Sequence, residues 1–289
     1  PDLEANMLPE GQWNISAIER DCNWLQALEG DIDTSHLAFL HFGTTNPEDV
    51  PEGTFQHYLV KDRAPRYSVL DTDFGTMYGA YREGRPGTNY WRIAQFLFPS
   101  HTIIPTGVLG LQIFARSWVP LDDDHTMAYT LTSRDWLGRV SANANVWPPL
   151  LPNTSDWYGR FRMAQCLEND YMIDREKQRR GQDWTGIPGI HTQDQAITES
   201  MGPILDRAGE HVGTADVMVI QTRRRLLAAV RALAEDGTIP PGVEDPTVYA
   251  QRAGGVYLPK DADWVEETKE LRKAFVDHPG LSHALSGGA

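Results

Sequence analysis

Hydrophobic residues recur at helical spacing in two parts of the chain. From Glu19 to about Leu40, large side chains stand three and four residues apart, which predicts a helix that Gly30 weakens in its middle. The members of this stripe are Trp24, Leu25, Leu28, Ile32 and His36. A second helix is predicted from near Thr214 to a stop at Gly237, and its stripe consists of Val217, Ile220, Leu227, Val230 and Leu233.

From about Arg66 to Trp136 the pattern changes to that of strands. Segments rich in Tyr, Val, Ile, Phe and Thr alternate with turn signals at intervals that suit an antiparallel meander. The segments are RYSVLDTDF, TMYGAYRE, NYWRIAQFLF, LGLQIFARSWV and HTMAYTLTS. In the fourth segment, Leu111, Ile113 and Ala115 alternate with Gln112 and Phe114, as in a strand with one face toward a core.

The remaining pattern completes the predicted architecture. Residues 137–190 are rich in Pro, Trp, Gly and charge, so we expect little regular structure there and a covering segment with a functional role. No repeat, low-complexity tract or Gly/Ser linker marks a boundary, so residues 1–289 are expected to form one domain. The predicted fold class is α+β, with a curved antiparallel sheet around a long C-terminal helix.

Composition and charge exclude several partners. The 289 residues include 40 acidic and 26 basic side chains, which give a formal net charge of -14. This charge repels nucleic acid and anionic membrane surfaces, so neither is expected as a partner.

No apolar run approaches the roughly 20 residues of a membrane span, and the first residues lack a signal core, so a cytoplasmic location is expected. Cys22 and Cys166 cannot form a disulfide framework or a four-cysteine metal site, and buried thiols are expected.

The stretch GDIDTSHLAFLH, from Gly30 to His41, places two histidines five residues apart. On an ideal helix their side chains point about 140° apart, so His36 and His41 share a metal ion only if the helix is bulged or ends there. Two imidazoles with a carboxylate form the facial triad of non-haem iron(II) oxygenases, which keeps positions open for dioxygen. Asp33 lies about 60° from His36 on the same face, so its carboxylate is expected to accept the second N–H of that imidazole.

A longer pattern resembles a known family. The segment CNWLQALEGDIDTSHLAFLH is similar to the start of the catalytic domain of Rieske non-haem iron ring-hydroxylating oxygenases, of the phthalate 4,5-dioxygenase and aromatic O-demethylase type. The similarity continues in KDRAPRYSVLDTDFGTMYGAYR, YWRIAQFLFPSHTIIPTGVLG, WVPLDDDHT and TQDQAITESMGPILDRAGEHVGTADVMVIQTRRRLL. The resemblance implies a helix-grip fold of the START/Bet v 1 type, which agrees with the predicted sheet and long helix.

The resemblance also implies roles for individual residues. His36 and His41 match the two iron-binding histidines of the family. Asp194 matches the iron-binding carboxylate, although the residues alone leave His191, three positions earlier, as an alternative third ligand. Asp33 matches the catalytic aspartate that links the iron to the Rieske cluster of a neighbouring subunit.

Further side chains are candidates for substrate contact. Arginine guanidinium groups suit an aromatic carboxylate because they bind it in a bidentate manner. The resemblance places Arg63, Arg66 and Arg92 in segments that line or approach the pocket of the family, and the hydroxyls of Thr34 and Ser35 are further candidates for contact with a polar group in the pocket. Each arginine has the alternative of a surface ion pair, and the hydroxyls of Thr34 and Ser35 have the alternative of bonding back to the helix.

Two charged runs have ordinary interpretations. Asp122, Asp123 and Asp124 with His125 resemble a metal site, but they fall where a hairpin turn is expected, and a solvated turn is favoured. The basic run of Arg223, Arg224 and Arg225 on the second helix is expected to form a salt-bridged face rather than an anion site.

The expected function follows from the resemblance. A Rieske [2Fe-2S] cluster needs CxH and CxxH motifs, which this sequence lacks, so that domain is expected on a missing N-terminal piece or on a separate polypeptide. The chain is expected to use dioxygen at a mononuclear Fe(II) to hydroxylate or O-demethylate an aromatic acid, with electrons from NAD(P)H delivered by a reductase or ferredoxin. A head-to-tail homotrimer or hexamer is expected. The alternative is a non-catalytic helix-grip protein that binds small molecules.

Overall fold

The core of the computed structural model, which describes residues 1–135 and 148–281, is an antiparallel sheet. Its strands are β1 (Trp13–Arg20), β2 (Arg66–Asp71), β3 (Gly75–Glu83), β4 (Thr88–Leu97), β5 (His101–Ile103), β6 (Phe114–Pro120), β7 (Thr126–Ser133) and β8 (Gly254–Pro259). Their order is β1-β7-β6-β5-β4-β3-β2, and β8 pairs with the part of β4 that β5 does not reach.

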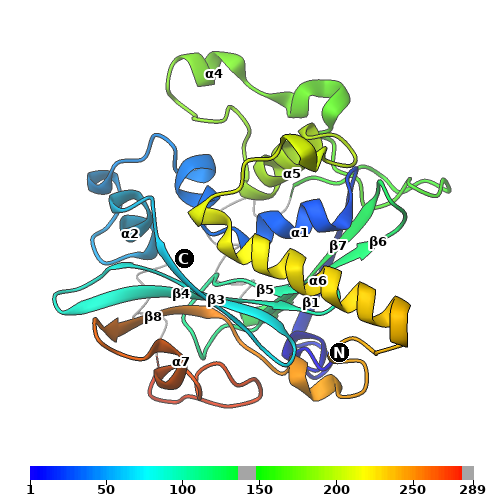
Figure 1. The fold of residues 1–289 in the computed structure, drawn as a ribbon. Coiled ribbons are helices and arrows are strands. Elements are labelled where there is room, and N and C mark those ends of the chain that lie inside the picture. The colour runs from blue at the N-terminus through cyan, green and yellow to red at the C-terminus, as the bar shows by residue number, and fades with distance from the viewer. Residues whose placement is uncertain (136–147, 282–289) are drawn as a thin grey trace.

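Helices lie on both faces of this sheet (Figure 1). The α-helices are α1 (Trp24–Ile32), α2 (Phe55–Lys61), α4 (Arg175–Arg179), α5 (Ile190–Ser200), α6 (Val217–Asp236) and α7 (Trp264–Glu267). The short helical turns are η1 (Glu4–Asn6), η2 (Leu37–His41), η3 (Pro47–Asp49), η4 (Leu167–Met172), η5 (Arg207–Gly209), η6 (Thr214–Asp216) and η7 (Pro246–Tyr249). None of the helices in the described ranges is long and apolar enough to cross a membrane.

The main core lies between the sheet and helices α1 and α6. Because side chains alternate along a strand, Tyr78, Ala80 and Phe96 share one sheet face, where they pack with Leu28 of α1 and Met218 of α6. We call this the helix-covered face. The opposite face carries Trp91, which stacks on Trp264 of α7 with ring centroids 5.5 Å apart. The α+β class and the helix-grip arrangement of sheet and long helix are therefore confirmed.

The predicted strands correspond closely to β2, β3, β4, β6 and β7, but one detail is wrong. The alternation of Leu111 and Ile113 does not belong to a strand, because β6 begins only at Phe114. Leu111 instead donates its backbone N–H to the carbonyl of Val108 in a turn. Ala115, the third member of the predicted series, is in β6 and is buried.

The two predicted helices form with corrected details. Glu19 belongs to β1, so the first helix begins only at Trp24, where the side chain of Asn23 accepts the backbone N–H of Leu25. It ends at Ile32 rather than near Leu40, because Asp33 is extended. The second helix ends as predicted at Gly237, which adopts a left-handed φ of 74°.

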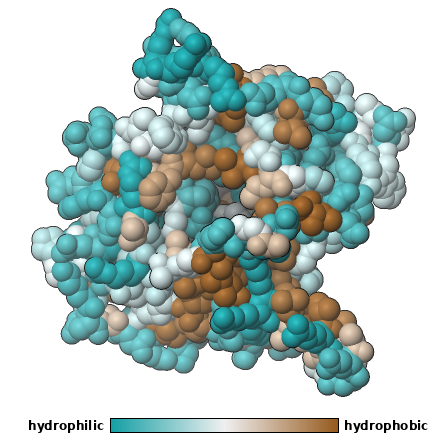
Figure 2. Space-filling view, turned by 45° about the horizontal axis from the view of Figure 1, so that its top comes forward, coloured by the Kyte–Doolittle hydropathy of each residue, from teal (hydrophilic) through white to brown (hydrophobic). Residues whose placement is uncertain are grey.

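The hydrophobic stripe predicted for α6 does not form the side of the helix that faces the core. Leu227, Val230 and Leu233 are all about half exposed or more, whereas Met218 and Val219 are buried. Figure 2 accordingly shows hydrophobic patches between hydrophilic areas on the surface of the molecule.

The segment expected to have little regular structure is only partly irregular. Of residues 137–190, those up to 147 lie outside the described residues. The remainder contains η4 and α4, and it leads into α5, which the hydrophobic pattern did not predict. This helix packs beside α1, where Gln26 of α1 donates to the carbonyl oxygens of Thr198 and Gly202 at 2.6 and 2.8 Å.

Candidate metal centre

The segment that carries both histidines is a π turn rather than a continued α-helix. The backbone N–H of Phe42 donates at 3.2 Å to the carbonyl of Leu37, five residues earlier, and Leu37–His41 form the π turn η2. A turn closed in this way places side chains five residues apart on the same side. The ring centroids of His36 and His41 are consequently 5.1 Å apart. Of the two conditions for their convergence, a bulged helix or a helix that ends, the structure shows that α1 ends at Ile32 and that a π turn follows.

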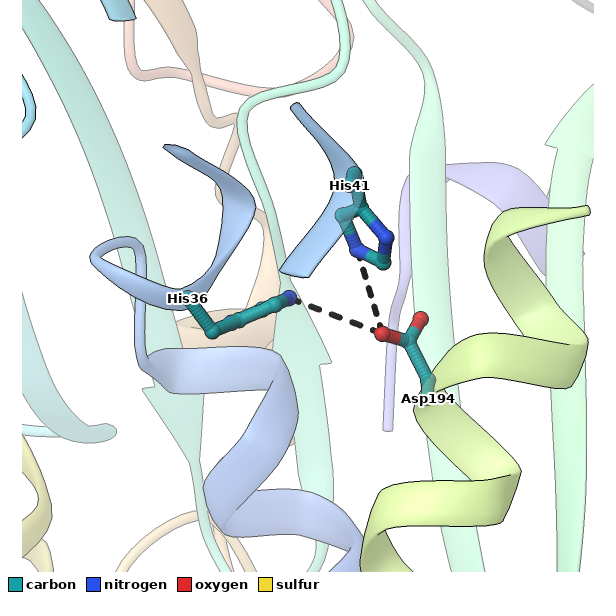
Figure 3. A group of neighbouring side chains, drawn as sticks. All are labelled: His36, His41 and Asp194. Atoms are coloured by element: carbon teal, nitrogen blue, oxygen red, sulfur yellow. Dashed lines mark ion pairs between the residues drawn. The ribbon is translucent and has the colours of Figure 1, made fainter. Parts of the chain in front are cut away.

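Asp194 approaches both imidazoles from the middle of α5 (Figure 3). Its Oδ1 lies 3.1 Å from Nε2 of His41 and 3.6 Å from Nε2 of His36. The three donor atoms lie within 4.8 Å of one another. In the part of the chain that the structure describes, no other group of three His, Cys, Asp or Glu side chains is this close.

Both imidazoles present Nε2 to the carboxylate because Nδ1 is engaged elsewhere. Nδ1 of His36 bonds to the backbone carbonyl of Asp33, and Nδ1 of His41 lies 2.7 Å from Oε1 of Gln193. An imidazole that donates through Nδ1 keeps the Nε2 lone pair for a metal ion. The structure thus directs two Nε2 atoms, which can bind a metal ion in place of a proton, and one carboxylate oxygen to a common point.

The charges at this point suit a cation. Burial opposes ionisation of Asp194, but the hydrogen bond from His41 and the charges of His41 and His36 outweigh it and hold the pKa of Asp194 well below its usual range. Burial likewise opposes protonation of His36, but interactions with Asp33 and Asp194 outweigh it and raise the pKa of His36. A metal ion binding here therefore competes with a proton on His36.

The donor set fits a ferrous ion. Two imidazole nitrogens and one carboxylate oxygen are the ligands of non-haem iron(II) sites that keep open positions. Metal bonds of about 2.1 Å at right angles place neighbouring donor atoms about 3 Å apart. The separations of 3.1 and 3.6 Å from Asp194 Oδ1 to the two Nε2 atoms meet this requirement with small side-chain adjustments.

Asp33 lies beside His36, but its carboxylate is not the acceptor that the sequence predicted. The oxygen bonded to Nδ1 of His36 is the backbone carbonyl of Asp33, and the nearer carboxylate oxygen is 3.6 Å from Nδ1. The carboxylate accepts the backbone N–H groups of Ser35 and His36 instead, at 2.7 and 3.2 Å. It thereby fixes the turn that leads into η2. The bridging role of Asp33 between subunits stays a prediction.

Thr34 and Arg92 meet beside the histidines. Nε of Arg92 donates to the hydroxyl of Thr34 at 3.2 Å, and both side chains are buried. The Arg92 guanidinium also lies over the ring of Phe55, 5.4 Å from its centroid. Ser35 makes a separate contact, 2.6 Å from the Tyr67 hydroxyl. The structure therefore links Arg92, through Thr34, to the loop that carries His36.

Sequence reasoning missed a second buried arginine. Arg82 pairs with Tyr90, and Arg92 pairs with Ala80, so the two arginines are diagonal neighbours on the helix-covered face, with Cα atoms roughly 7–8 Å apart. Arg82 is 1% exposed, and neither Nη1 nor Nη2 has a hydrogen-bond partner among the described residues. The signal was present in TMYGAYRE, where Arg82 is in phase with Tyr78 and Ala80.

Arg82 and Arg92 place two buried positive charges on the helix-covered face. Within the described ranges, no carboxylate lies within 4.0 Å of Arg82 or Arg92. Burial and the positive charge of Arg92 lower the pKa of Arg82 to about 10, which leaves it charged at neutral pH. Buried cations are normally paired, because removing them from water is costly.

The other two predicted substrate arginines lie elsewhere. Arg63 donates to the backbone carbonyl oxygens of Ala38 and Thr45 and so braces the π turn. Arg66 is exposed on the opposite sheet face, where its guanidinium lies 6.0 Å from the ring centroid of Tyr81. The structure brings neither of them to the unpaired guanidinium groups.

The remaining sequence interpretations have clear outcomes. His191 precedes Asp194 by one turn of α5 and is outside the three-residue group. Asp122 accepts the backbone N–H groups of two residues in its own turn, so the solvated turn is confirmed. Arg223 pairs with Glu29 and Glu210, which confirms a salt-bridged face. Of the two thiols, only that of Cys22 is fully buried, because Cys166 is partly exposed.

Comparison with known proteins places this geometry in a family. The family model described as LigXa C-terminal domain like matches residues 4–281. The chain belongs to this family. The 3-chlorobenzoate-3,4-dioxygenase oxygenase subunit of Comamonas testosteroni is 41% identical over 279 residues, which cover 91% of this chain and 64% of that protein. The phthalate 4,5-dioxygenase oxygenase subunit of Pseudomonas putida is 32% identical over 254 residues, which cover 84% of this chain and 56% of that protein.

The predicted resemblance to oxygenase subunits of Rieske-type systems is thus confirmed for this LigXa C-terminal domain-like chain. Among solved structures, dicamba monooxygenase bound to dicamba has a TM-score of 0.46 and 10% identity, with 79% of this chain and 61% of that chain covered. The chain spans less than two thirds of the length of these curated relatives.

Proposed function

We propose that residues 1–289 form the iron-binding catalytic domain of a Rieske-type aromatic oxygenase and that the substrate is an aromatic acid. The grouping of His36, His41 and Asp194 is the observation that supports this most directly. Their donor atoms match the facial triad that holds Fe(II) and leaves positions open. When bound, the iron would supply the activation of dioxygen that hydroxylation or O-demethylation requires.

The residues of the chain then hold and orient the reacting groups. The ionised carboxylate of Asp194 offsets part of the charge of the cation, and the two Nδ1 contacts keep both imidazoles turned toward it. Ring hydroxylation and O-demethylation would use the same ligands. Product analysis distinguishes these outcomes, because only demethylation of a methoxylated substrate releases formaldehyde.

Arg82 and Arg92 are proposed to bind the carboxylate of the substrate. Two buried guanidinium groups without an acid partner favour a ligand that brings a negative charge. The two relatives described above are named for reactions on 3-chlorobenzoate and phthalate, which are both aromatic carboxylates. Thr34 orients Arg92 through its hydroxyl, and Phe55 covers the guanidinium.

Electrons for the reaction must come from outside the described residues. We propose a [2Fe-2S] Rieske cluster on the rest of the protein or on a separate chain, reduced by NAD(P)H through a reductase or ferredoxin. If the cluster of one subunit serves the iron of the next, a head-to-tail ring such as a homotrimer results. Asp33, whose side chain is 25% exposed next to His36, is the proposed route into the site.

The function is tested by turnover of the complete system with benzoate-type substrates under ¹⁸O₂. We expect wild-type protein to give a hydroxylated product with ¹⁸O in the new hydroxyl, or a demethylated phenol with one formaldehyde released per O₂ consumed, because formaldehyde exchanges its own oxygen with water. A hydroxylated product without ¹⁸O, formaldehyde release that does not require O₂, or tight aromatic binding without any iron would contradict the oxygenase proposal, and the last would favour a binding protein.

The same assay tests Asp33. We expect Asp33→Ala to retain iron, because Asp33 donates no ligand atom to the three-residue group, but to lose product formation. The substitution keeps the backbone carbonyl that holds His36 but removes the carboxylate that fixes the turn, so Asp33→Asn, which keeps an acceptor oxygen for the N–H of Ser35, is measured beside it and should also retain iron and lose product. Iron per chain and product per NAD(P)H are the two measurements. Full turnover by Asp33→Ala would refute the electron-transfer role while leaving the iron site intact.

A further inference from the structure

One of the proposed metal ligands, His41, is hydrogen-bonded to a side chain whose orientation is fixed, that of Gln193. Oε1 of Gln193 lies 2.7 Å from Nδ1 of His41. The amide nitrogen of Gln193 donates to the backbone carbonyl of Ile187 at 2.7 Å and to the hydroxyl of Thr185 at 3.0 Å. A backbone carbonyl only accepts hydrogen bonds, so the NH₂ end of the amide must face Ile187. The oxygen end must then face His41.

This orientation determines which nitrogen of His41 carries the proton. An amide oxygen only accepts, so Nδ1 of neutral His41 must donate, and its Nε2 must hold the lone pair. The side chain of His41 is 2% exposed, so water cannot readily replace the amide oxygen. Nε2 is the atom that lies 3.1 Å from Asp194.

From this geometry we infer that Gln193 is a positioning residue that fixes the Nδ1–H tautomer of His41 and thereby its capacity to bind metal. This inference rests on the proposed function, because it concerns a ligand of the proposed iron. It also assigns a role to the loop that precedes α5. Thr185 and Ile187 hold the amide of Gln193, so the loop acts on His41 through one side chain.

The arrangement differs between the two histidines. His36 is held by a backbone carbonyl, which no substitution removes. His41 is held by a side chain that directly precedes Asp194 in α5. One helix therefore supplies both the carboxylate and the group that orients the second imidazole, so the position of α5 sets two of the three donor atoms together.

The experiment compares Gln193→Leu with Gln193→Glu. Both substitutions change the contacts to Thr185 and Ile187, but only Glu keeps an oxygen that accepts from Nδ1 of His41. In metal-free protein labelled with ¹⁵N-histidine, we expect Nδ1 of His41 to stay protonated in wild type and in Gln193→Glu. We expect a shift toward the Nε2–H form in Gln193→Leu. The resonance is assigned by its loss in His41→Asn.

Iron affinity provides the second readout. By anaerobic titration against a competing chelator, Gln193→Leu should bind Fe(II) about 10- to 100-fold more weakly than wild type, and Gln193→Glu should stay within about threefold. Gln195→Leu is the matched control, because Gln195 is buried in the same helix and its Oε1 has no partner among the described residues. We expect it to bind Fe(II) like wild type.

The inference is overturned if Gln193→Leu keeps both the Nδ1–H form and wild-type affinity. It is also overturned if Leu and Glu weaken iron binding equally, because the effect would then come from the lost loop contacts. Either result leaves the iron site itself standing. A different result would separate the two proposals. If wild-type protein does not bind iron, but the proton on Nδ1 of His41 still depends on Gln193, the proposed function is wrong and the role of Gln193 in fixing the tautomer is retained.

Discussion

Asp194→Ala is expected to abolish stoichiometric iron binding, with Fe(II) affinity reduced by more than about 100-fold. This loss of affinity is larger than the 10- to 100-fold loss that is typical when only a hydrogen-bond partner of a metal ligand is removed. Asp194 supplies the single negatively charged donor of the group, at 3.1 and 3.6 Å from the two imidazole nitrogens. Two neutral imidazoles alone neither offset the charge of the cation nor complete the facial triad. Iron per chain after anaerobic reconstitution is the measurement.

The variant is expected to remain folded, which circular dichroism checks. Among the described residues, the polar contacts of the Asp194 side chain are with His36 and His41, and its backbone carbonyl accepts from the Thr198 hydroxyl. Asp236→Ala, which removes an exposed carboxylate at the end of α6, is the control and should bind iron like wild type. Retention of one iron per chain by Asp194→Ala would exclude the proposed ligand set.

Arg82→Met is expected to weaken binding of benzoate by roughly 10- to 150-fold, which corresponds to the loss of a charged hydrogen bond worth about 1.5–3 kcal/mol. Nη1 and Nη2 of Arg82 have no partner in the described structure, so a bound carboxylate is the group that would satisfy them. Without ligand, the variant should unfold at a temperature no lower than wild type, because the cost of burying a cation without an ion pair offsets the lost hydrogen bond from Arg82 Nε to the Asp62 carbonyl. Calorimetric titration and thermal unfolding measure the two effects.

Arg66→Met is the matched control for this experiment. It makes the same chemical change on the opposite sheet face, where Arg66 is exposed over Tyr81, and it should leave benzoate binding unchanged. Benzamide, which has the same shape without the charge, should bind wild type and Arg82→Met almost equally. Unchanged discrimination between benzoate and benzamide in Arg82→Met would contradict the assignment of this arginine to the substrate carboxylate.

The sequence predicted the elements whose signal is local. Strands β2, β3, β4, β6 and β7 follow from alternation and turn residues, whereas β5 lies in a segment predicted to be a turn. The five-residue spacing of His36 and His41 indicated only that a helix must be bulged or end for both to bind one ion. The choice of Asp194 came from family resemblance, because nothing in its neighbourhood marks it as a ligand. Its approach to the histidines depends on the packing of α5 beside α1, which is a long-range contact.

The sequence did not predict helix α5 or the burial of Arg82, and both failures have physical reasons. Helix α5 has no apolar stripe, because several of its buried positions are polar: Thr192, Gln195, Thr198 and Glu199. A search for hydrophobic periodicity therefore cannot find it. The burial of Arg82 was not predicted, because charged residues on strands are usually exposed and Arg82 alternates in phase with core residues. Such a conflict between residue type and position is itself typical of a functional site.

The central claim is that His36, His41 and Asp194 hold one ferrous ion. The most direct test is a crystal structure of anaerobically reconstituted protein, with anomalous difference maps on both sides of the iron absorption edge. The account predicts one peak per chain, bonded to Nε2 of both histidines and to the carboxylate of Asp194. A map without iron at this position, or with iron bound by other side chains while these three stay apart, would contradict it.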